Sequence, residues 1–530
     1  MSKWMTESDV EELFLDILSN IGYSIECGPD ISPGGKEQER EYSDPVLTDR
    51  LKEKLRLINP EIPIEAIDEA IRIIRKNNSQ DLVSNNHDFH NLIVNGIDVQ
   101  YRKKNGSIKH DKVFIFDFNN IENNEFLAVN QFTIIENRHE RRPDIVLFVN
   151  GIPIVIIELK NPEDENATIW SAYRQIQTYL SEIPSMFRFN ELCIVSDGID
   201  SRYGTITSPR ERYSEWKTVD YERPKDLTQF ETLIRGLLTP GVLLDVVRNF
   251  IVYEMDRSNG ALRISKKVAA YQQYNATNKA LLSTVSAIGS DHRAGIVWHT
   301  QGSGKSLTMV FYTGKLVLDP KMENPTVIVL TDRNDLDDQL FGTFARCQEL
   351  LRQEPKQADS RESLKSLINV ASGGIVFTTI QKFLPEEGND FPLLSERKNI
   401  VVIADEAHRS QYGFRADISR EDADIKYGYA KYLRDAVPNA TFIGFTGTPI
   451  EKEDRSTPQV FGKYVDIYDV QQAVEDGSTV RIYYESRLAK IDLKPEERPH
   501  IDQEFEEVTE GEENRVTSIN DVFHCLSIEF

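Results

Sequence analysis

The sequence predicts an α/β protein in which a domain built on a mixed sheet precedes a domain built on a parallel sheet. A chain of 530 residues is too long for one hydrophobic core. Near residue 260 the apolar pattern changes from amphipathic segments to short strands that are apolar on both faces. We therefore expect domains at 1–258 and 259–470, followed at 471–530 by a connector and the start of a truncated further lobe.

The first domain mixes helical and strand-like periodicities. Apolar residues recur every three to four positions over 62–76, which predicts an amphipathic helix. A second helix is expected over 171–183. Strands are expected at "DVQYRK" (98–103), "KVFIFDF" (112–118) and "DIVLFV" (144–149). This mixture is typical of an α/β domain whose strands run in both directions.

In the second domain, wholly apolar strands alternate with helical segments. Such strands are buried on both faces, so they predict a parallel sheet that helices cover on each side. The Ser-Asn-Gly at 258–260 predicts a turn just before this domain. The expected strands are 295–298, 326–330, 374–379, 400–404 and 441–446.

The composition is that of an ordinary globular protein, with 39% hydrophobic and 28% charged residues. Its apolar runs are too short to cross a bilayer, and no basic segment leads into an apolar stretch at the N-terminus. We expect a cytoplasmic protein. No CxxC pair is present, which argues against a disulfide framework or a zinc site. The four cysteines, expected to be reduced core residues, are Cys27, Cys193, Cys347 and Cys525.

The net charge of −24 does not exclude a nucleic-acid partner, because the distribution of charge matters more than its sum. Basic clusters occur at 101–110, 137–142 and 208–217. Each cluster is as consistent with a solvated loop as with a DNA contact. The acidic stretch at 496–514 is expected to be a linker or a surface excursion.

The stretch "GIPIVIIELKNP" is an apolar strand that ends in two charged residues. Side chains alternate along a strand, so Glu158 and Lys160 leave on the same side. A three-residue hairpin loop before this strand would pair Val149 with Pro153, and hence Asp144 with Glu158. The sequence therefore predicts that two carboxylates and an ammonium group converge.

Two neighbouring carboxylates repel each other unless a cation lies between them, and oxygen ligands of this kind suit Mg²⁺. Asp144 and Glu158 are therefore the expected metal ligands. Lys160 would orient an attacking water or stabilise charge on a phosphate. This arrangement predicts metal-dependent hydrolysis of a phosphodiester.

The "PD…ExK" pattern resembles that of the PD-(D/E)xK nuclease superfamily. Gln175 and Tyr179 form a "QxxxY" that is similar to the accessory motif of its RecB-like branch, which implies that they position DNA or Lys160. Glu11 matches the first-helix acid that often completes the metal site in such nucleases. From the residues alone, a surface salt bridge, a helix-packing face and a solvent-exposed acid stay open as alternatives.

The stretch "HTQGSGKS" (299–306) follows a predicted strand and precedes a helical run. Glycines let backbone N–H groups approach phosphates at a helix N-terminus, a lysine reaches the outer phosphates, and Ser or Thr binds Mg²⁺. His299 takes the place of the first glycine of the general P-loop pattern, and an ordinary glycine-rich turn is the alternative. The expected nucleotide-binding residues here are Gly302, Ser303, Gly304, Lys305 and Ser306.

The stretch "IVVIADEAHRS" places an acidic pair directly after a buried strand. Asp405 would hold Mg²⁺, and Glu406 would polarise the water that attacks the γ-phosphate. With the P-loop before it and "TGTP" (446–449) after it, this order resembles the first RecA-like lobe of superfamily 2 helicases. Gln273 lies where that superfamily often keeps an adenine-reading glutamine, and a solvated amide is the alternative.

Together these motifs resemble the restriction (R, HsdR) subunit of type I restriction-modification enzymes. The resemblance implies a RecB-like endonuclease domain at 1–258 and a RecA-like translocase lobe at 259–470. It implies ATP and Mg²⁺ as cofactors. Duplex DNA and the methyltransferase (M) and specificity (S) subunits are the implied partners, with no membrane, and sequence recognition is expected in the partner subunits.

Two other interpretations stay open. One is a stand-alone translocase or defence ATPase whose first domain binds DNA without cutting it, and the other is a non-catalytic assembly subunit. By the same resemblance, ATP hydrolysis needs a second RecA-like lobe. The roughly 80 residues after Thr448 are too few for one. We therefore expect an N-terminal fragment of a longer subunit.

Overall fold

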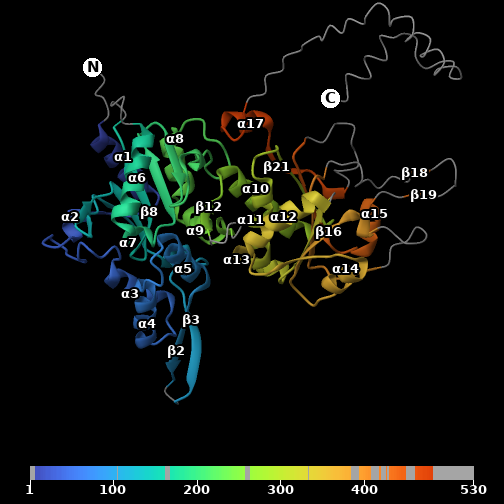
Figure 1. Cartoon of the computed structure of the whole chain (residues 1–530), viewed down its shortest axis with the longest axis horizontal. Helices are drawn as coiled ribbons and strands as arrows, with labels where there is room; N and C mark the ends of the chain where they lie inside the picture. The colour runs from blue at the N-terminus through green and yellow to red at the C-terminus, as the bar shows by residue number, and fades with distance from the viewer. Residues whose placement is uncertain are drawn as a thin grey trace, which may run out of the picture. The chain divides into compact units, whose positions relative to one another are not determined.

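The computed structural model describes most of the first 480 residues, namely 6–103, 106–161, 168–256, 263–331, 334–383, 393–407, 417–418, 425–426, 429–448 and 460–480. They contain a mixed sheet followed by a parallel sheet, so the predicted fold class is confirmed (Figure 1). Residues Met1–Thr479 form one compact unit. Within the described ranges no helix is long and apolar enough to span a bilayer.

The mixed sheet has six strands in the order β1-β4-β7-β8-β9-β10, of which β1–β4 and β8–β9 pair in parallel. The strands are β1 (Ser24–Cys27), β4 (Phe126–Asn130), β7 (Ile145–Val149), β8 (Ile152–Leu159), β9 (Leu192–Ser196) and β10 (Ser201–Gly204). The covering helices are α1 (Glu7–Asn20) and α6 (Ile169–Glu182). Ile157 shares a core cluster with Phe14 of α1, whereas Ile156 shares one with Ile176 of α6. All of β8 is buried for this reason.

Smaller elements surround this sheet. The helices are α2 (Gly28–Ile31), α3 (Thr48–Ile58), α4 (Ile64–Arg75), α5 (Leu82–Asn95), α7 (Pro184–Phe187), α8 (Gln229–Leu237) and α9 (Pro240–Asn249), with 3₁₀ turns η1 (Ile121–Asn123) and η2 (Arg210–Arg212). The paired strands are β2 (Ile97–Arg102) with β3 (Ile108–Val113), β5 (Ile134–Glu136) with β6 (His139–Arg141), and β11 (Ile251–Asp256) with β12 (Arg263–Val268). Helices α4 and α6 confirm the two predicted helices. The predicted turn at 258–260, and with it the predicted domain boundary, lies outside the described residues.

The predicted strand at 112–118 is wrong. The strand is β3, which ends at Val113, and β2 and β3 form a ribbon that extends away from the mixed sheet (Figure 1). Asn59 bonds to both backbone groups of Phe114, at 2.8 and 2.9 Å, in place of a strand partner. Ile115 and Phe116 are then buried in the core, which explains why the segment looks like a strand.

The parallel sheet has seven strands in the order β15-β16-β14-β17-β20-β13-β21, and every adjacent pair is parallel. The strands are β13 (Arg293–His299), β14 (Thr326–Thr331), β15 (Pro355–Gln357), β16 (Ile375–Thr379), β17 (Ile400–Ala404), β20 (Thr441–Thr446) and β21 (Tyr464–Tyr468). The five predicted strands are the five central ones. Strands β15 and β21 were not predicted, because an edge strand is only partly buried and carries polar residues.

Helices accompany the parallel sheet as the alternating pattern predicts. They are α10 (Tyr271–Ala287), α11 (Lys305–Leu318), α12 (Asn334–Arg346), α13 (Gln348–Leu351), α14 (Arg361–Ile368), α15 (Tyr429–Ala436) and α17 (Val470–Glu475), with 3₁₀ turns η3 (Pro320–Met322) and η4 (Ile380–Phe383). Two short strands, β18 (Asp417–Ile418) and β19 (Ile425–Lys426), pair with each other. Helix α11 begins at Lys305, at the end of the predicted P-loop stretch, which is where that motif requires a helix.

Among the described cysteines none forms a disulfide. Cys193 and Cys347 are buried, as predicted. Cys27 is exposed, so its assignment to the core is wrong: it ends β1, an edge strand of the mixed sheet. Cys525 lies outside the described residues.

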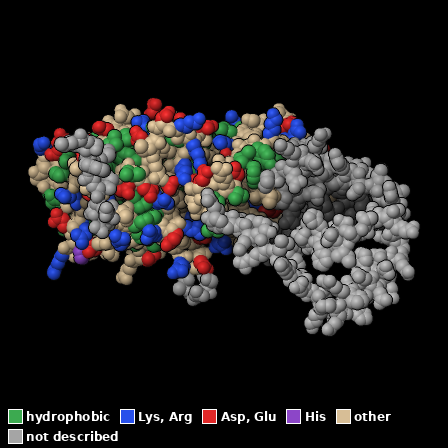
Figure 2. Space-filling model, turned by 90° about the horizontal axis from the view of Figure 1, so that it is seen from above, with side chains coloured by type: hydrophobic (Ala, Val, Ile, Leu, Met, Phe, Trp, Pro, Cys, Tyr) green, Lys and Arg blue, Asp and Glu red, His purple; other side chains and the backbone are tan. Residues whose placement is uncertain are grey.

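Basic side chains do not gather into one large patch on the face seen in Figure 2, where Lys and Arg are interspersed with Asp and Glu. Cations in all three predicted basic clusters form ion pairs. These are Lys109 with Asp111, Arg141 with Glu182, and Lys217 with Glu215 and Asp476. A nucleic-acid contact would therefore need basic side chains that do not take part in these ion pairs.

A buried ion pair attaches β12 to the mixed sheet. Lys266 Nζ lies 2.7 Å from Glu191 Oε2, and neither side chain is exposed. Lys266 also donates to the carbonyl of Asn190 and to Asn86 Oδ1 of α5, while His90 Nδ1 lies 3.1 Å from the Glu191 carboxylate. Burial opposes charge on Glu191, but the attraction of Lys266 and His90 outweighs it and lowers the pKa of this carboxyl group. Burial lowers the pKa of the Lys266 ammonium group, and the charge of Glu191 opposes that shift.

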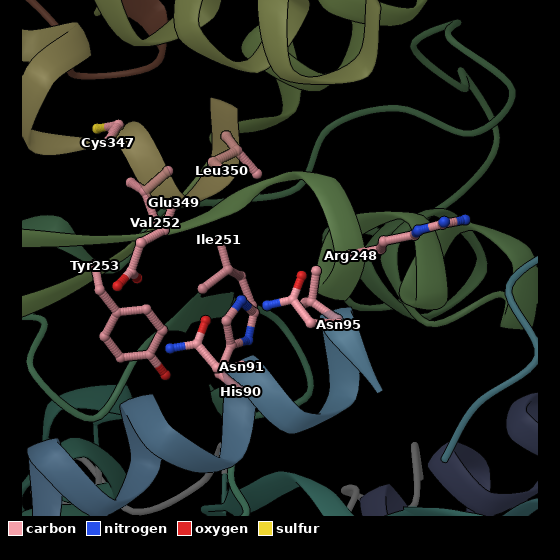
Figure 3. Close-up of a pocket in the computed structure, with 11 residues that line it drawn as sticks. His90, Asn91, Asn95, Arg248, Ile251, Val252, Tyr253, Cys347, Glu349 and Leu350 are labelled. Carbon is pink, nitrogen blue, oxygen red and sulfur yellow. The ribbon is translucent and has the colours of Figure 1, made fainter. Parts of the chain in front are cut away.

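Helix α5 also lines a small polar pocket (Figure 3). His90 and Asn91 face Tyr253 of β11 and Glu349 of α13 across it. His87, one turn earlier on α5, places its Nε2 2.6 Å from Glu349 Oε2, and this contact lowers the pKa of Glu349. His90 and Glu349 interact with charged or polar partners within the fold, and Arg248 lies over the ring of Phe118, so we regard the pocket as a packing contact and not as a ligand site.

Replacing Lys266 with methionine is expected to destabilise the fold by about 3–5 kcal/mol, because Glu191 would stay buried without its cation. The matched control is Lys267→Met. Lys267 pairs with Glu254 at the surface, so its loss should cost less than about 1 kcal/mol. Urea unfolding followed by circular dichroism compares the two variants. Equal stabilities for both would contradict a structural role of the buried pair.

Candidate functional site

The turn between β7 and β8 has two residues, so the predicted three-residue loop is wrong. Asn150 and Gly151 both have positive φ, 52° and 79°, as a type I′ turn requires. Val149 therefore pairs with Ile152 and not with Pro153. A side chain at position 151 would lie 2.5 Å from the carbonyl oxygen of Leu47, so only glycine fits there.

A bulge in this hairpin restores the register that the sequence predicts near the site. It lies between the second and third pairs from the turn, and beyond it Ile145 pairs with Ile157. The next position along the ladder brings Asp144 beside Glu158. The backbone N–H of Leu159 donates to Asp144 Oδ2 at 2.7 Å, which holds the two strand ends together.

Asp144 and Glu158 are both buried, and Glu158 is not exposed at all. Lys160 Nζ donates to Glu158 Oε1 at 2.8 Å, whereas the other carboxylate oxygen, Oε2, is buried without a hydrogen-bond partner. Burial and then repulsion from Asp144 raise the pKa of Glu158 to about 8. Burial also raises the pKa of Asp144 to about 6, although the Leu159 N–H and Lys160 oppose this shift. A cation between the two groups would remove this penalty.

Helix α6 brings Gln175 and Tyr179 together one turn apart. Gln175 Nε2 donates to Tyr179 Oη at 2.6 Å. Tyr179 is buried in the same core cluster as Ile156 of β8, on the face of the strand that carries Glu158. Burial and then the charge of Glu158 raise the pKa of the Tyr179 hydroxyl. The tyrosine thus stays protonated beside the carboxylates.

Helix α1 places two acids near the same carboxylates. Glu11 accepts hydrogen bonds from Asn130 Nδ2 at 2.6 Å and Gln131 Nε2 at 2.8 Å. Repulsion from Glu7 and Glu11 contributes to the raised pKa of Asp144. No group of three or more His, Cys, Asp or Glu side chains in the described ranges is arranged to hold a metal, so a ligand role for Glu11 stays a prediction.

Three residues near the site, Glu7, Asn130 and Gln131, were not predicted from the sequence. The i, i+4 spacing of Glu7 and Glu11 on an amphipathic helix was a signal that could have found Glu7. The two amides follow a strand whose place beside β7 is set by the sheet, and no local pattern marks them. The backbone N–H of Gln131 donates to the carbonyl of Asp144 at 2.8 Å, which fixes this neighbourhood.

The predicted P-loop joins the end of β13 to α11. Gly302 and Gly304 have φ values of 83° and 85°, which glycine adopts without strain. Ser303 turns inward and donates to the Thr300 carbonyl at 2.6 Å, so its side chain shapes the loop. Ser306 lies half-buried in the first turn of α11, where a Mg²⁺-binding hydroxyl is expected.

His299 occupies the position of the first glycine of the general P-loop pattern and has a structural contact there. Its imidazole is fully buried, and Nε2 lies 2.9 Å from Asp466 Oδ2 of β21. Asp466 also accepts a hydrogen bond from Lys279 of α10 at 2.9 Å. The histidine therefore attaches the base of the loop to the neighbouring strand β21.

Gln273 of α10 contacts the P-loop directly. Its Nε2 donates to the Gly304 carbonyl at 3.0 Å, and its Oε1 accepts from the Ala270 N–H at 2.9 Å. Both ends of the amide are engaged with the backbone. Gln273 is therefore not a solvated amide, and its role in reading adenine stays a prediction.

The predicted acidic pair lies against the P-loop lysine. Lys305 Nζ lies 2.9 Å from Asp405 Oδ1 and 2.6 Å from Glu406 Oε1. Burial opposes the charge of Lys305, but Asp405 and Glu406 outweigh it and raise the pKa of the ammonium group. His408 and Pro449, the ends of "DEAH" and "TGTP", lie outside the described residues.

Comparison with known proteins matches each half of the chain to a family. Residues 5–212 match the type I restriction enzyme R protein N terminus, and residues 272–518 match the SWI2/SNF2 ATPase. The chain is 42% identical to the type I restriction enzyme HindI endonuclease subunit of Haemophilus influenzae, over 97% of this chain and 50% of that protein. It is 35% identical to the putative type I restriction enzyme MjaIXP endonuclease subunit of Methanocaldococcus jannaschii, over 98% of this chain and 49% of that protein.

The chain thus spans about half the length of the curated relatives it matches. Among solved structures, it is similar to the fragment structure of a putative HsdR subunit of a type I restriction enzyme from Vibrio vulnificus. That likeness has a TM-score of 0.26 and 17% identity, and covers 66% of this chain and 56% of the other. A TM-score this low carries no structural detail from one protein to the other.

Proposed function

Because this chain belongs to the family of type I restriction endonuclease (R) subunits, we propose that it supplies DNA cleavage and ATP-driven DNA translocation to a cytoplasmic restriction-modification complex. The observation that carries the cleavage role is the buried pair of Asp144 and Glu158 with Lys160 beside it. Duplex DNA is the substrate. Methyltransferase and specificity subunits are the partners, and they recognise the DNA sequence.

Asp144 and Glu158 would hold Mg²⁺, and the orphaned, buried Oε2 of Glu158 fits a metal ligand. The metal, when bound, would lower the pKa of a water molecule and withdraw charge from the scissile phosphate. Lys160 is held at this position by Glu158, so its ammonium group would orient the attacking water or stabilise the phosphate. Gln175 and Tyr179 would position Lys160 or the DNA strand, and Glu11 would complete the metal site.

At the nucleotide site, Lys305 would leave the carboxylates of Asp405 and Glu406 to bind the outer phosphates of ATP. Ser306 and Asp405 would hold the Mg²⁺ that accompanies ATP. Glu406 would then be released to polarise the attacking water. The backbone of 302–304 would surround the phosphates, and Gln273 would exchange a backbone contact for the adenine ring.

Replacing Asp144 or Glu158 with alanine is expected to reduce plasmid cleavage by the assembled complex at least about a hundredfold, because the metal loses a ligand. Lys160→Ala should act in the same way. ATP hydrolysis should persist, since these residues lie in the other half of the chain. Glu12→Ala, which removes an exposed acid of α1, is the matched control. Wild-type cleavage by the Glu158→Ala complex would refute the assignment.

Mg²⁺ binding by the chain without nucleotide is expected to strengthen with rising pH. Because the pKa values of Asp144 and Glu158 are raised to about 6 and about 8, a proton on Glu158 competes with the metal between these values. The affinity should rise about tenfold per pH unit in that window and level off above it. Calorimetric titrations across the window test this. The steep rise should be lost in Glu158→Gln, and a pH-independent affinity of the parent chain would contradict the shared site.

Replacing Lys305 with alanine is expected to reduce ATP-driven translocation by at least about a hundredfold, because the outer phosphates lose a fixed positive charge. Methylation by the partner subunits should be unchanged. Lys321→Ala, an exposed lysine of η3, is the matched control. A triplex-displacement assay measures translocation. An equal loss of methylation would show that this chain is not a separable motor subunit.

A further inference from the structure

An open groove lies beside the candidate nuclease site, between residues 140–142 and one face of α6. Gln175 and Tyr179 belong to that face and line the groove. Tyr179 lies close enough to Glu158 for each to shift the pKa of the other, and Arg142 is two residues from Asp144. Tyr179 therefore links the lining of the groove to the predicted metal-binding carboxylates.

Two arginines in the groove have no charged partner among the described residues. Arg142 and Arg174 are exposed, and neither makes an ion pair or a side-chain hydrogen bond with any residue in the described part of the chain. Arg141, between the two walls, is different: it pairs with Glu182 of α6. Among the described residues that line the groove, Glu140 is the acid and Arg141, Arg142 and Arg174 are the bases. The lining therefore carries an excess of positive charge.

The remaining side chains of the groove leave the arginines as its main hydrogen-bond donors. Ser171 Oγ donates to the Thr168 carbonyl at 2.7 Å, and Thr178 Oγ1 donates to the Arg174 carbonyl at 3.1 Å. No aliphatic side chain is among the described residues that line it. A peptide partner would need an apolar anchor, whereas a guanidinium group binds a phosphate through two parallel hydrogen bonds.

We propose that Arg142 and Arg174 bind backbone phosphates of the DNA strand on either side of the bond that is cut, and so position that strand over Asp144 and Glu158. This inference rests on the proposed nuclease function. Both arginines are positioning residues, because they would hold the substrate without touching the reacting atoms. Contacts of this kind carry no sequence information, which suits an enzyme whose partners recognise the sequence.

The test compares Arg142→Gln, Arg174→Gln and the double variant in the assembled restriction complex. Cleavage and translocation are measured in the same reactions. We expect each single variant to cleave about tenfold more slowly and the double variant about a hundredfold more slowly. Translocation should stay within about twofold of the parent. Lysine at either position should restore part of the rate, because one charge contact returns without the fork geometry.

The salt dependence of the cleavage rate distinguishes a DNA contact from a merely structural role, because a structural role would not change it. The slope of log cleavage rate against log salt, at limiting DNA, should fall by about one for each arginine removed. The matched control is Arg56→Gln on α3, an exposed arginine that likewise has no partner in the described ranges. Its cleavage rate and salt slope should equal those of the parent complex.

Parental rates and slopes in the double variant would overturn the groove assignment, and so would equal losses of cleavage and translocation. Glu158→Ala is assayed in parallel. If that variant cleaves DNA, the proposed nuclease site itself fails, whatever the arginine variants do. If it is inactive while the double arginine variant cleaves normally, only the role of the groove fails.

Discussion

The cost of burying a carboxylate is the constraint on which the site and the fold around it depend. Glu158 and Glu191 are both fully buried, yet the pKa of Glu158 is raised to about 8 whereas that of Glu191 is lowered. Glu191 faces the buried cation Lys266, and no second acid in the described part of the chain is among the causes of its pKa shift. Glu158 has Lys160 as its cation but also has Asp144 beside it. Repulsion from Asp144 is the difference between the two carboxylates. Glu191 stabilises the fold, whereas Glu158 is placed to bind a cation in the proposed function.

The candidate nucleotide site meets the same constraint with the signs reversed. Lys305 lies between Asp405 and Glu406, so one cation balances part of the charge of two acids. In the proposed function, phosphate oxygens replace the carboxylates around the lysine, and Mg²⁺ replaces the lysine beside Asp405. One set of ion pairs is thus exchanged for another.

Local patterns predicted the chemistry and the centre of each sheet. The five inner strands of the parallel sheet are apolar on both faces, a signal that lies within five or six residues. The edge strands β15 and β21 were not predicted, because each has only one neighbouring strand and keeps polar residues. The strand predicted at 112–118 does not continue past Val113, because Asn59, far away in sequence, supplies the hydrogen bonds that a strand partner would otherwise make.

The sequence by itself determined which groups carry the proposed chemistry, since Asp144, Glu158 and the P-loop lysine stand at spacings that strand and helix geometry require. Only the tertiary structure decided the hairpin register, through a two-residue turn and a compensating bulge. It also decided that Glu7 and the amides after β4 lie near the carboxylates, and that Arg142 and Arg174 have no ion-pair partner among the described residues. Turn conformation, bulges and the pairing of surface charges depend on contacts between segments distant in sequence. Such contacts leave no periodic pattern in the chain.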